Sequence, residues 1–255
     1  NLRFVTNQEF EEAKDKVMMG AERRSKVITE EDKKLVAYHE AGHAIAGINS
    51  SFHDPLHKVS IISRGQAGGV TMFLPERDKD YHRMNELKDK MVSIVGGRVA
   101  EEIIFGKDQI TSGAGQDITQ VTKIARAMVT ELGMSEKLGT IKYSNDSQEV
   151  FLGHSVTQTK NMSDATAQAL DEEVKKLVDE AIDTCRKILT KKIDDLHKVA
   201  KGLMEYETLT LEEVKDLIKG IPPSRDDLDN DKDPKQSIPS QSVPKSSSTV
   251  SPQTQ

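Results

Sequence analysis

Two histidines and a glutamate, His39, Glu40 and His43, lie in the otherwise apolar stretch LVAYHEAGHAIAG. Histidines four residues apart on a helix lie one turn above each other on the same face, so both imidazoles can bind one tetrahedral zinc ion. Glu40 is then placed to act as the general base toward a zinc-bound water. A helix that is apolar on nearly every face is buried, and its polar side chains need partners. The pattern therefore predicts a catalytic zinc site.

A catalytic zinc site needs a third protein ligand, and spacing alone leaves three candidates. Glu101 and Glu102 lie in a stretch of helical periodicity, as the third ligand of a thermolysin-like site does. Asp117 instead follows a glycine-rich turn at the start of a predicted helix. Ordinary structural roles also fit, since Asp117 can complement a helix dipole and Glu101 can pair with Arg98. The spacing does not choose among them.

The remaining chain predicts a mainly α fold with a small β region of two or three short strands and long C-terminal helices. Capping boxes mark helix starts at Thr6 and Thr210. Helical periodicity predicts helices over 7–23, from 29 onward, over 84–106, 118–133, 170–203 with a bend near 190, and 210–220. Runs of β-branched residues bounded by glycine and proline predict strands within 57–65 and 68–75, and suggest another at 139–144.

The second of these strands has two interpretations. An edge strand beside the zinc site could pair with the backbone of an extended peptide substrate, whereas a plain core strand fits the same residues equally well. The residues concerned are Gly69, Val70, Thr71, Met72 and Phe73.

Composition narrows the function classes. A formal net charge of -6 and a pI near 5.7 argue against a nucleic-acid partner. The only cysteine, Cys185, lies at helical spacing from apolar residues, so we expect a buried core thiol and no disulfide within the chain. No apolar run approaches the roughly 20 residues of a membrane-spanning helix, and we expect this stretch of chain to be soluble. Residues 221–255 are rich in proline and serine and are predicted to form a disordered tail.

Three motifs occur in a fixed order, HEAGHAIAG, GGRVAEEIIFG and TSGAGQDI. In this order and separation they resemble the peptidase domain of the FtsH family, which are membrane-anchored, ATP-dependent zinc metalloproteases. The resemblance covers nearly everything from Asn1 to Gly220. It implies that His39, His43 and Asp117 hold one zinc ion per subunit. It also implies that Glu40 is the catalytic glutamate, and it makes Glu101 a candidate for orienting a ligand.

The resemblance also implies a domain organisation. Residues 1–28 would be the end of an ATPase module and a linker, 29–220 the zinc metallopeptidase domain, and 221–255 the tail. No P-loop motif occurs in the chain, so ATP would act only through a domain absent from it.

In the resembling family, a homo-hexamer delivers unfolded or damaged membrane and soluble polypeptides to the protease. Its membrane anchor would lie in N-terminal segments absent from this chain. The peptidase domain would face the cytoplasm at a bacterial inner membrane or occupy an organellar equivalent. Two other hypotheses are a stand-alone zinc peptidase and a non-enzymatic helical interaction module.

Overall fold

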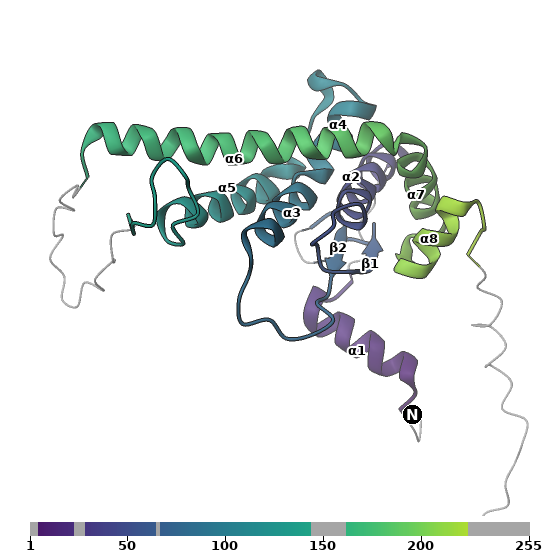
Figure 1. Ribbon diagram of the computed structural model, residues 1–255. Helices are drawn as coiled ribbons and strands as arrows, with labels where there is room; N and C mark the ends of the chain where they lie inside the picture. Colours follow the sequence, from purple (N-terminus) through teal and green to yellow (C-terminus); the bar gives the residue numbers. More distant parts are fainter. Residues whose placement is uncertain (1–4, 23–28, 65–66, 144–161, 224–255) are drawn as a thin grey trace, which may run out of the picture. The chain divides into compact units, whose positions relative to one another are not determined.

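Helices dominate the part of the chain that a computed structural model describes, namely residues 5–22, 29–64, 67–143 and 162–223 (Figure 1). The predicted mainly α class with a small β region is confirmed. The described residues end at 223, so the predicted tail of residues 221–255 lies almost wholly outside them. The helices are α1 Asn7–Met19, α2 Glu30–Ile48, α3 Met84–Ile94, α4 Gly96–Ile104, α5 Gly115–Thr130, α6 Asp164–Lys191, α7 Ile193–Tyr206 and α8 Leu211–Lys219.

Local capping explains several helix ends. Both predicted capping boxes are present, at Thr6 with Glu9 and at Thr210 with Glu213. α8 ends at Gly220, whose φ of 85° is in the left-handed region. The prediction that the first helix reaches residue 23 is wrong. α1 ends at Met19 because Gly20 takes a φ of 83°, which a continuing helix does not permit.

The stretch 84–106 was predicted as one helical region, but it forms two helices that meet at Val95. α4 starts with Gly96 and crosses α2 at Gly42 so closely that the backbones touch. A Cβ built on Gly42 would lie 2.4 Å from Gly96 O, and one on Gly96 would lie 2.6 Å from Gly42 O. The break between α3 and α4 lets α4 change direction and pack closely against α2. Helical periodicity in the sequence does not reveal such a change of direction.

The apolar stripe over 170–203 is confirmed as helix, with an interruption at Lys192 close to the expected bend. α6 packs on α3, α4 and α5, and α7 then turns away to pack on α2 (Figure 1). α6 and α7 therefore pack against different helices of the domain. The buried apolar side chains within 170–203 are Leu170, Val174, Ala181, Cys185, Leu189, Leu196, Val199, Ala200 and Leu203.

The small sheet has the order β2-β1-β3. β1 (Leu56–Ser60) and β2 (Val70–Phe73) are antiparallel neighbours, as the sequence predicts, and Gly69 lies just before β2. The strand suggested at 139–144 is wrong for its described residues, because Tyr143 donates its N–H to Thr130 O at the end of α5. The third strand is β3 (Thr208–Thr210), antiparallel to β1.

None of the described helices is long and apolar enough to span a bilayer.

We predict that Gly42→Ala destabilises the protein by about 3 kcal/mol, because the added methyl group meets the backbone of α4 and neither helix can yield locally. Chemical denaturation measures the loss. Gly115→Ala is the matched control, since a Cβ there meets nothing within 4 Å, and its free energy of unfolding should change by less than about 1 kcal/mol. Equal stability of both variants would contradict the tight crossing.

Cys185 is fully buried, and burial raises the pKa of its thiol to about 12. We predict that the native protein does not react with a thiol reagent such as dithionitrobenzoate at pH 8, because the reactive thiolate is suppressed and inaccessible. After unfolding in guanidinium chloride, one thiol per chain should react, since the sequence holds a single cysteine. Rapid reaction in the native state would contradict the packing of α6.

Candidate metal centre

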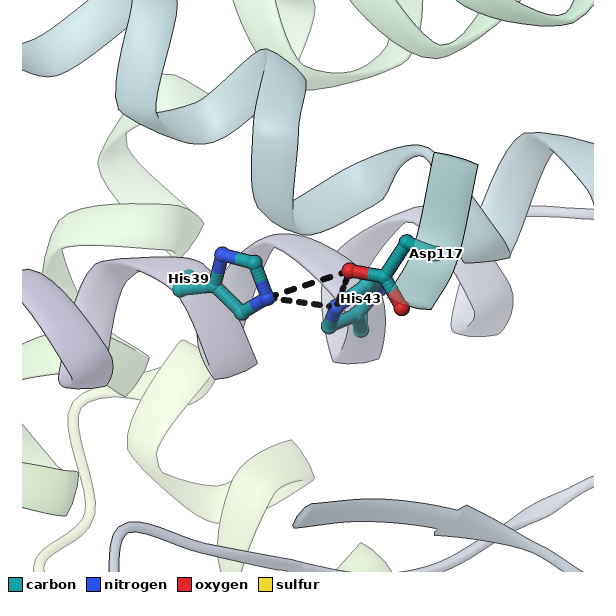
Figure 2. Close-up of side chains that lie close together, drawn as sticks. All are labelled: His39, His43 and Asp117. Carbon is teal, nitrogen blue, oxygen red and sulfur yellow. Dashed lines mark hydrogen bonds and ion pairs between the residues drawn. The ribbon is translucent and has the colours of Figure 1, made fainter. Parts of the chain in front are cut away.

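Three potential ligand atoms converge between α2 and α5 (Figure 2). The Nε2 atoms of His39 and His43 lie 3.1 Å apart, and Asp117 Oδ2 lies 3.3 Å from the first and 3.5 Å from the second. Two ligands of a tetrahedral zinc ion bound at about 2.0–2.1 Å are separated by about 3.3 Å. The three atoms therefore form a triangle of the size that one face of a zinc tetrahedron requires.

The helical placement of these side chains follows from the sequence. His39 and His43 occupy successive turns of α2, and their rings are 4.7 Å apart between centroids. Asp117 lies in the first turn of α5, directly after the short 3-10 helix Ser112–Ala114. Residues from distant parts of the chain thus meet at one point, and the glycine-rich turn brings the carboxylate there.

Glu101 holds the far side of the His39 ring. Its carboxylate is fully buried, and Oε1 lies 2.7 Å from His39 Nδ1. Its other oxygen, Oε2, accepts a hydrogen bond of 2.8 Å from the backbone N–H of Thr111, whose hydroxyl also donates to the carboxylate. Because a carboxylate only accepts, Nδ1 carries a proton and Nε2 is left to face Asp117.

His43 is oriented by backbone. Its Nδ1 lies 2.8 Å from Ser93 O, in the last turn of α3, so this nitrogen also donates and Nε2 is directed to the cluster. The ring of His39, in turn, occupies the space beside Gly97, where a Cβ would lie 2.5 Å from its Nε2. Both imidazoles are therefore held in place by α3 and α4.

Burial and hydrogen bonding shift the pKa values of the clustered side chains in opposite directions. Burial alone lowers the pKa of His39, but hydrogen bonds with Asp117 and Glu101 outweigh it and raise that pKa to about 10. Burial raises the pKa of Asp117, but its hydrogen bonds with the two imidazoles hold it well below its usual range. The same balance lowers the pKa of Glu101. These directions favour ionised carboxylates, and a cation bound here would replace a proton on an imidazole.

Glu40 lies in the same cleft, which has a volume of about 530 Å³. Its side chain is largely buried, and its Oε2 accepts a hydrogen bond of 2.7 Å from the hydroxyl of Thr71 in β2. Gly69, Val70, Thr71 and Phe73 line the cleft beside it. The residues expected to hold a metal, to act as a base and, apart from Met72, to contact substrate thus line one cavity.

Glu102, the remaining candidate ligand, points elsewhere. Its carboxylate pairs with Arg186 at 2.7 Å and with Arg98 at 3.8 Å. Arg98 is therefore the partner of Glu102. The pairing of Arg98 with Glu101, which the sequence also allowed, does not occur. Sequence reasoning missed Thr111 and Ser93. Thr111 is the first residue of the motif TSGAGQD, so its hydroxyl could have been proposed as a hydrogen-bond donor from the sequence. The contact of Ser93 is made by its backbone carbonyl, which no sequence pattern indicates.

In a comparison with models of protein families, residues 26–217 match the model described as Peptidase family M41. The chain belongs to peptidase family M41. This match contains α2 to α7 and the whole cluster of potential ligands, so the family and the geometry concern the same residues. The M41 match also covers the Glu101 and Thr111 hydrogen bonds.

Individual relatives agree with the M41 assignment. The chain is similar to the ATP-dependent zinc metalloprotease FtsH of Caulobacter vibrioides, with 55% identity over 89% of this chain and 36% of the relative. The FtsH of Photobacterium profundum is 52% identical over 86% of this chain and 31% of its own length, and that of Haemophilus influenzae 48% over 87% and 35%. This chain spans about a third of the length of these relatives.

We predict that Asp117→Ala loses zinc, because only two imidazoles remain and a two-ligand site binds the ion far more weakly. The measurement is metal content per chain by plasma mass spectrometry after gel filtration, where the unchanged protein should carry one zinc. Glu102→Ala is the matched control on α4 and should retain the ion, since its carboxylate faces arginines. Retained zinc in Asp117→Ala would move the third ligand to another residue.

Proposed function

We propose that this chain is the zinc-dependent endopeptidase part of an FtsH-like protease, with His39, His43 and Asp117 as metal ligands and Glu40 as general base. The observation that carries the proposal is the triangle of two imidazole nitrogens and one carboxylate oxygen beside a separate buried glutamate. The relatives' names contain the words zinc metalloprotease, which agrees with this chemistry.

His39, His43 and Asp117 would hold the zinc ion, which would supply Lewis-acid chemistry by lowering the pKa of water from 15.7 toward about 7 and by polarising a peptide carbonyl. Glu40 accepts the proton that the attacking water loses and later passes it to the departing amine. Glu101 keeps the proton of His39 on Nδ1, and Ser93 O does the same for His43. The protein thus supplies the base and fixes the ligands, as peptide hydrolysis requires.

We also propose that substrate binds as an extended strand along β2, over Gly69, Val70, Thr71, Met72 and Phe73. β2 is the outer strand of the described sheet, with β1 on one side only. Leu74 donates its N–H to Pro55 O on that side. Backbone groups of successive strand residues face opposite edges, so those of Thr71 and Phe73 face the open edge. Pairing there would read main chain more than side chains.

The wider assembly is a proposal of the same kind. Residues 29–220 would be the peptidase domain, 1–28 the end of an ATPase module, and 221–255 a tail. ATP dependence, a homo-hexamer, a membrane anchor and unfolded polypeptide substrates would belong to the longer protein. Two facts support this view, namely the relatives' names, which include ATP-dependent, and the third of their length that this chain spans.

We predict that Glu40→Gln abolishes peptide cleavage, lowering kcat by about 10³-fold, because the amide cannot accept the proton. Zinc content should stay at one per chain, since Glu40 is not among the three converging ligand atoms. The assay is cleavage of a quenched fluorescent peptide with metal analysis of the same sample. Substantial activity in Glu40→Gln would reject the proposed base, and an absence of zinc in the unchanged protein would reject the metallopeptidase.

A further inference from the structure

The start of β2 fits closely around the carboxylate of Glu40. A Cβ built on Gly69 would lie 2.6 Å from Glu40 Oε1 and 2.7 Å from its Cγ. Two residues along, the hydroxyl of Thr71 donates to Glu40 Oε2 at 2.7 Å. Gly69, immediately before β2, and Thr71, within it, therefore lie against the two different oxygens of this side chain.

The two carboxylate oxygens have different surroundings. Oε2 is held by Thr71, whose hydroxyl has a single proton and lies closer to this oxygen than to Glu40 O, at 3.2 Å. Among the residues that the structure describes, Oε1 has no hydrogen-bond partner. The missing side chain of Gly69 leaves space next to it, on the cleft that Glu40 and Gly69 both line.

We infer that β2 positions the general base: Thr71 is a positioning residue that anchors Glu40 Oε2, and Gly69 keeps Oε1 clear to accept a proton. This inference rests on the proposed function. It goes further in assigning one strand two tasks, because the strand proposed to align the substrate backbone also fixes the base. The distance between the scissile bond and the base is then set by one short rigid element, which is the kind of pre-organisation that favours reaction.

Thr71 lies on a half-buried strand that lines the cleft, and its hydroxyl is directed to the carboxylate of Glu40. Glu40 is largely buried, and a buried carboxylate without a donor adopts other rotamers or draws in water. A charge-assisted hydrogen bond from a hydroxyl on the strand is among the stronger ways to hold it. α2 alone offers no such donor, since its neighbouring side chains are apolar apart from the two histidines.

The test compares Thr71→Val with Thr71→Ser in the complete, zinc-loaded protein. Valine keeps the shape and removes the donor, so kcat for a quenched fluorescent peptide should fall by about 10–100-fold, the loss expected for a hydrogen bond to a charged group. KM should change by less than about twofold, because backbone pairing on β2 is retained. Serine restores the hydroxyl and should keep kcat within about threefold.

A readout independent of turnover completes the test. The affinity for a phosphinic pseudo-peptide, whose oxygens mimic the reacting centre, should fall about tenfold or more in Thr71→Val and recover in Thr71→Ser. Zinc content should remain one per chain in both. Thr184→Val is the control, since its hydroxyl only bonds Glu180 O on the exposed surface of α6, and it should change none of these values.

Unchanged kcat in Thr71→Val, a rise in KM alone, or a failure of serine to restore kcat would overturn the inference. If Thr71→Val does not fold, Gly69→Ala decides once circular dichroism shows that it is folded, because its methyl group meets Glu40 Oε1 as well as Ser60 O of β1. It should lower kcat at least tenfold with zinc retained. Full activity in Gly69→Ala would overturn the inference as well. An absence of zinc in the unchanged protein is a different result, which removes the proposed function instead.

Discussion

The contact between the backbones of α2 and α4 is the constraint on which the site depends. Gly42 and Gly96 lie so close that neither position has space for a Cβ, and Gly97 leaves space for the ring of His39. At this separation Glu101 on α4 reaches His39 Nδ1, and Ser93 at the end of α3 reaches His43 Nδ1. A wider crossing would separate the imidazoles from both acceptors. Packing of small residues thus determines the orientation of the polar ones.

That orientation allows the buried carboxylates and imidazoles to form hydrogen bonds, which offset the free-energy cost of burying charged groups. The carboxylates of Glu101 and Asp117 contact opposite nitrogens of the His39 ring, and Thr111 satisfies the remaining oxygen of Glu101. Hydrogen bonds overcome burial and raise the pKa of His39 while lowering those of both carboxylates. The cluster is therefore a connected network in which the loop after α4 and the start of α5 are tied to α2.

The sheet contributes to this arrangement from the other side of the cleft. β2 has one neighbour in the described sheet and places Thr71 against Glu40. Helices consequently supply the converging nitrogens and carboxylates, whereas a strand supplies the contact to the remaining glutamate. The small sheet of this mainly helical domain thus lines the same cleft as the converging side chains of the helices.

Local patterns in the sequence were sufficient to predict the features that depend only on residues close together along the chain. The spacing of His39 and His43 determined that both rings share one face of α2, because helical periodicity is local, and the capping boxes at Thr6 and Thr210 located helix starts for the same reason. The expected strands β1 and β2 also follow from short runs of β-branched residues.

Only the tertiary structure decided which distant groups meet. Spacing left Glu101, Glu102 and Asp117 equivalent, and the fold brings Asp117 to the imidazoles, Glu101 behind one of them and Glu102 to Arg186. The break at Val95, the third strand at Thr208–Thr210 and the bond from Thr71 to Glu40 likewise depend on how separate segments cross. Periodicity specifies the face of an element, but the partner of that face is determined by three-dimensional packing.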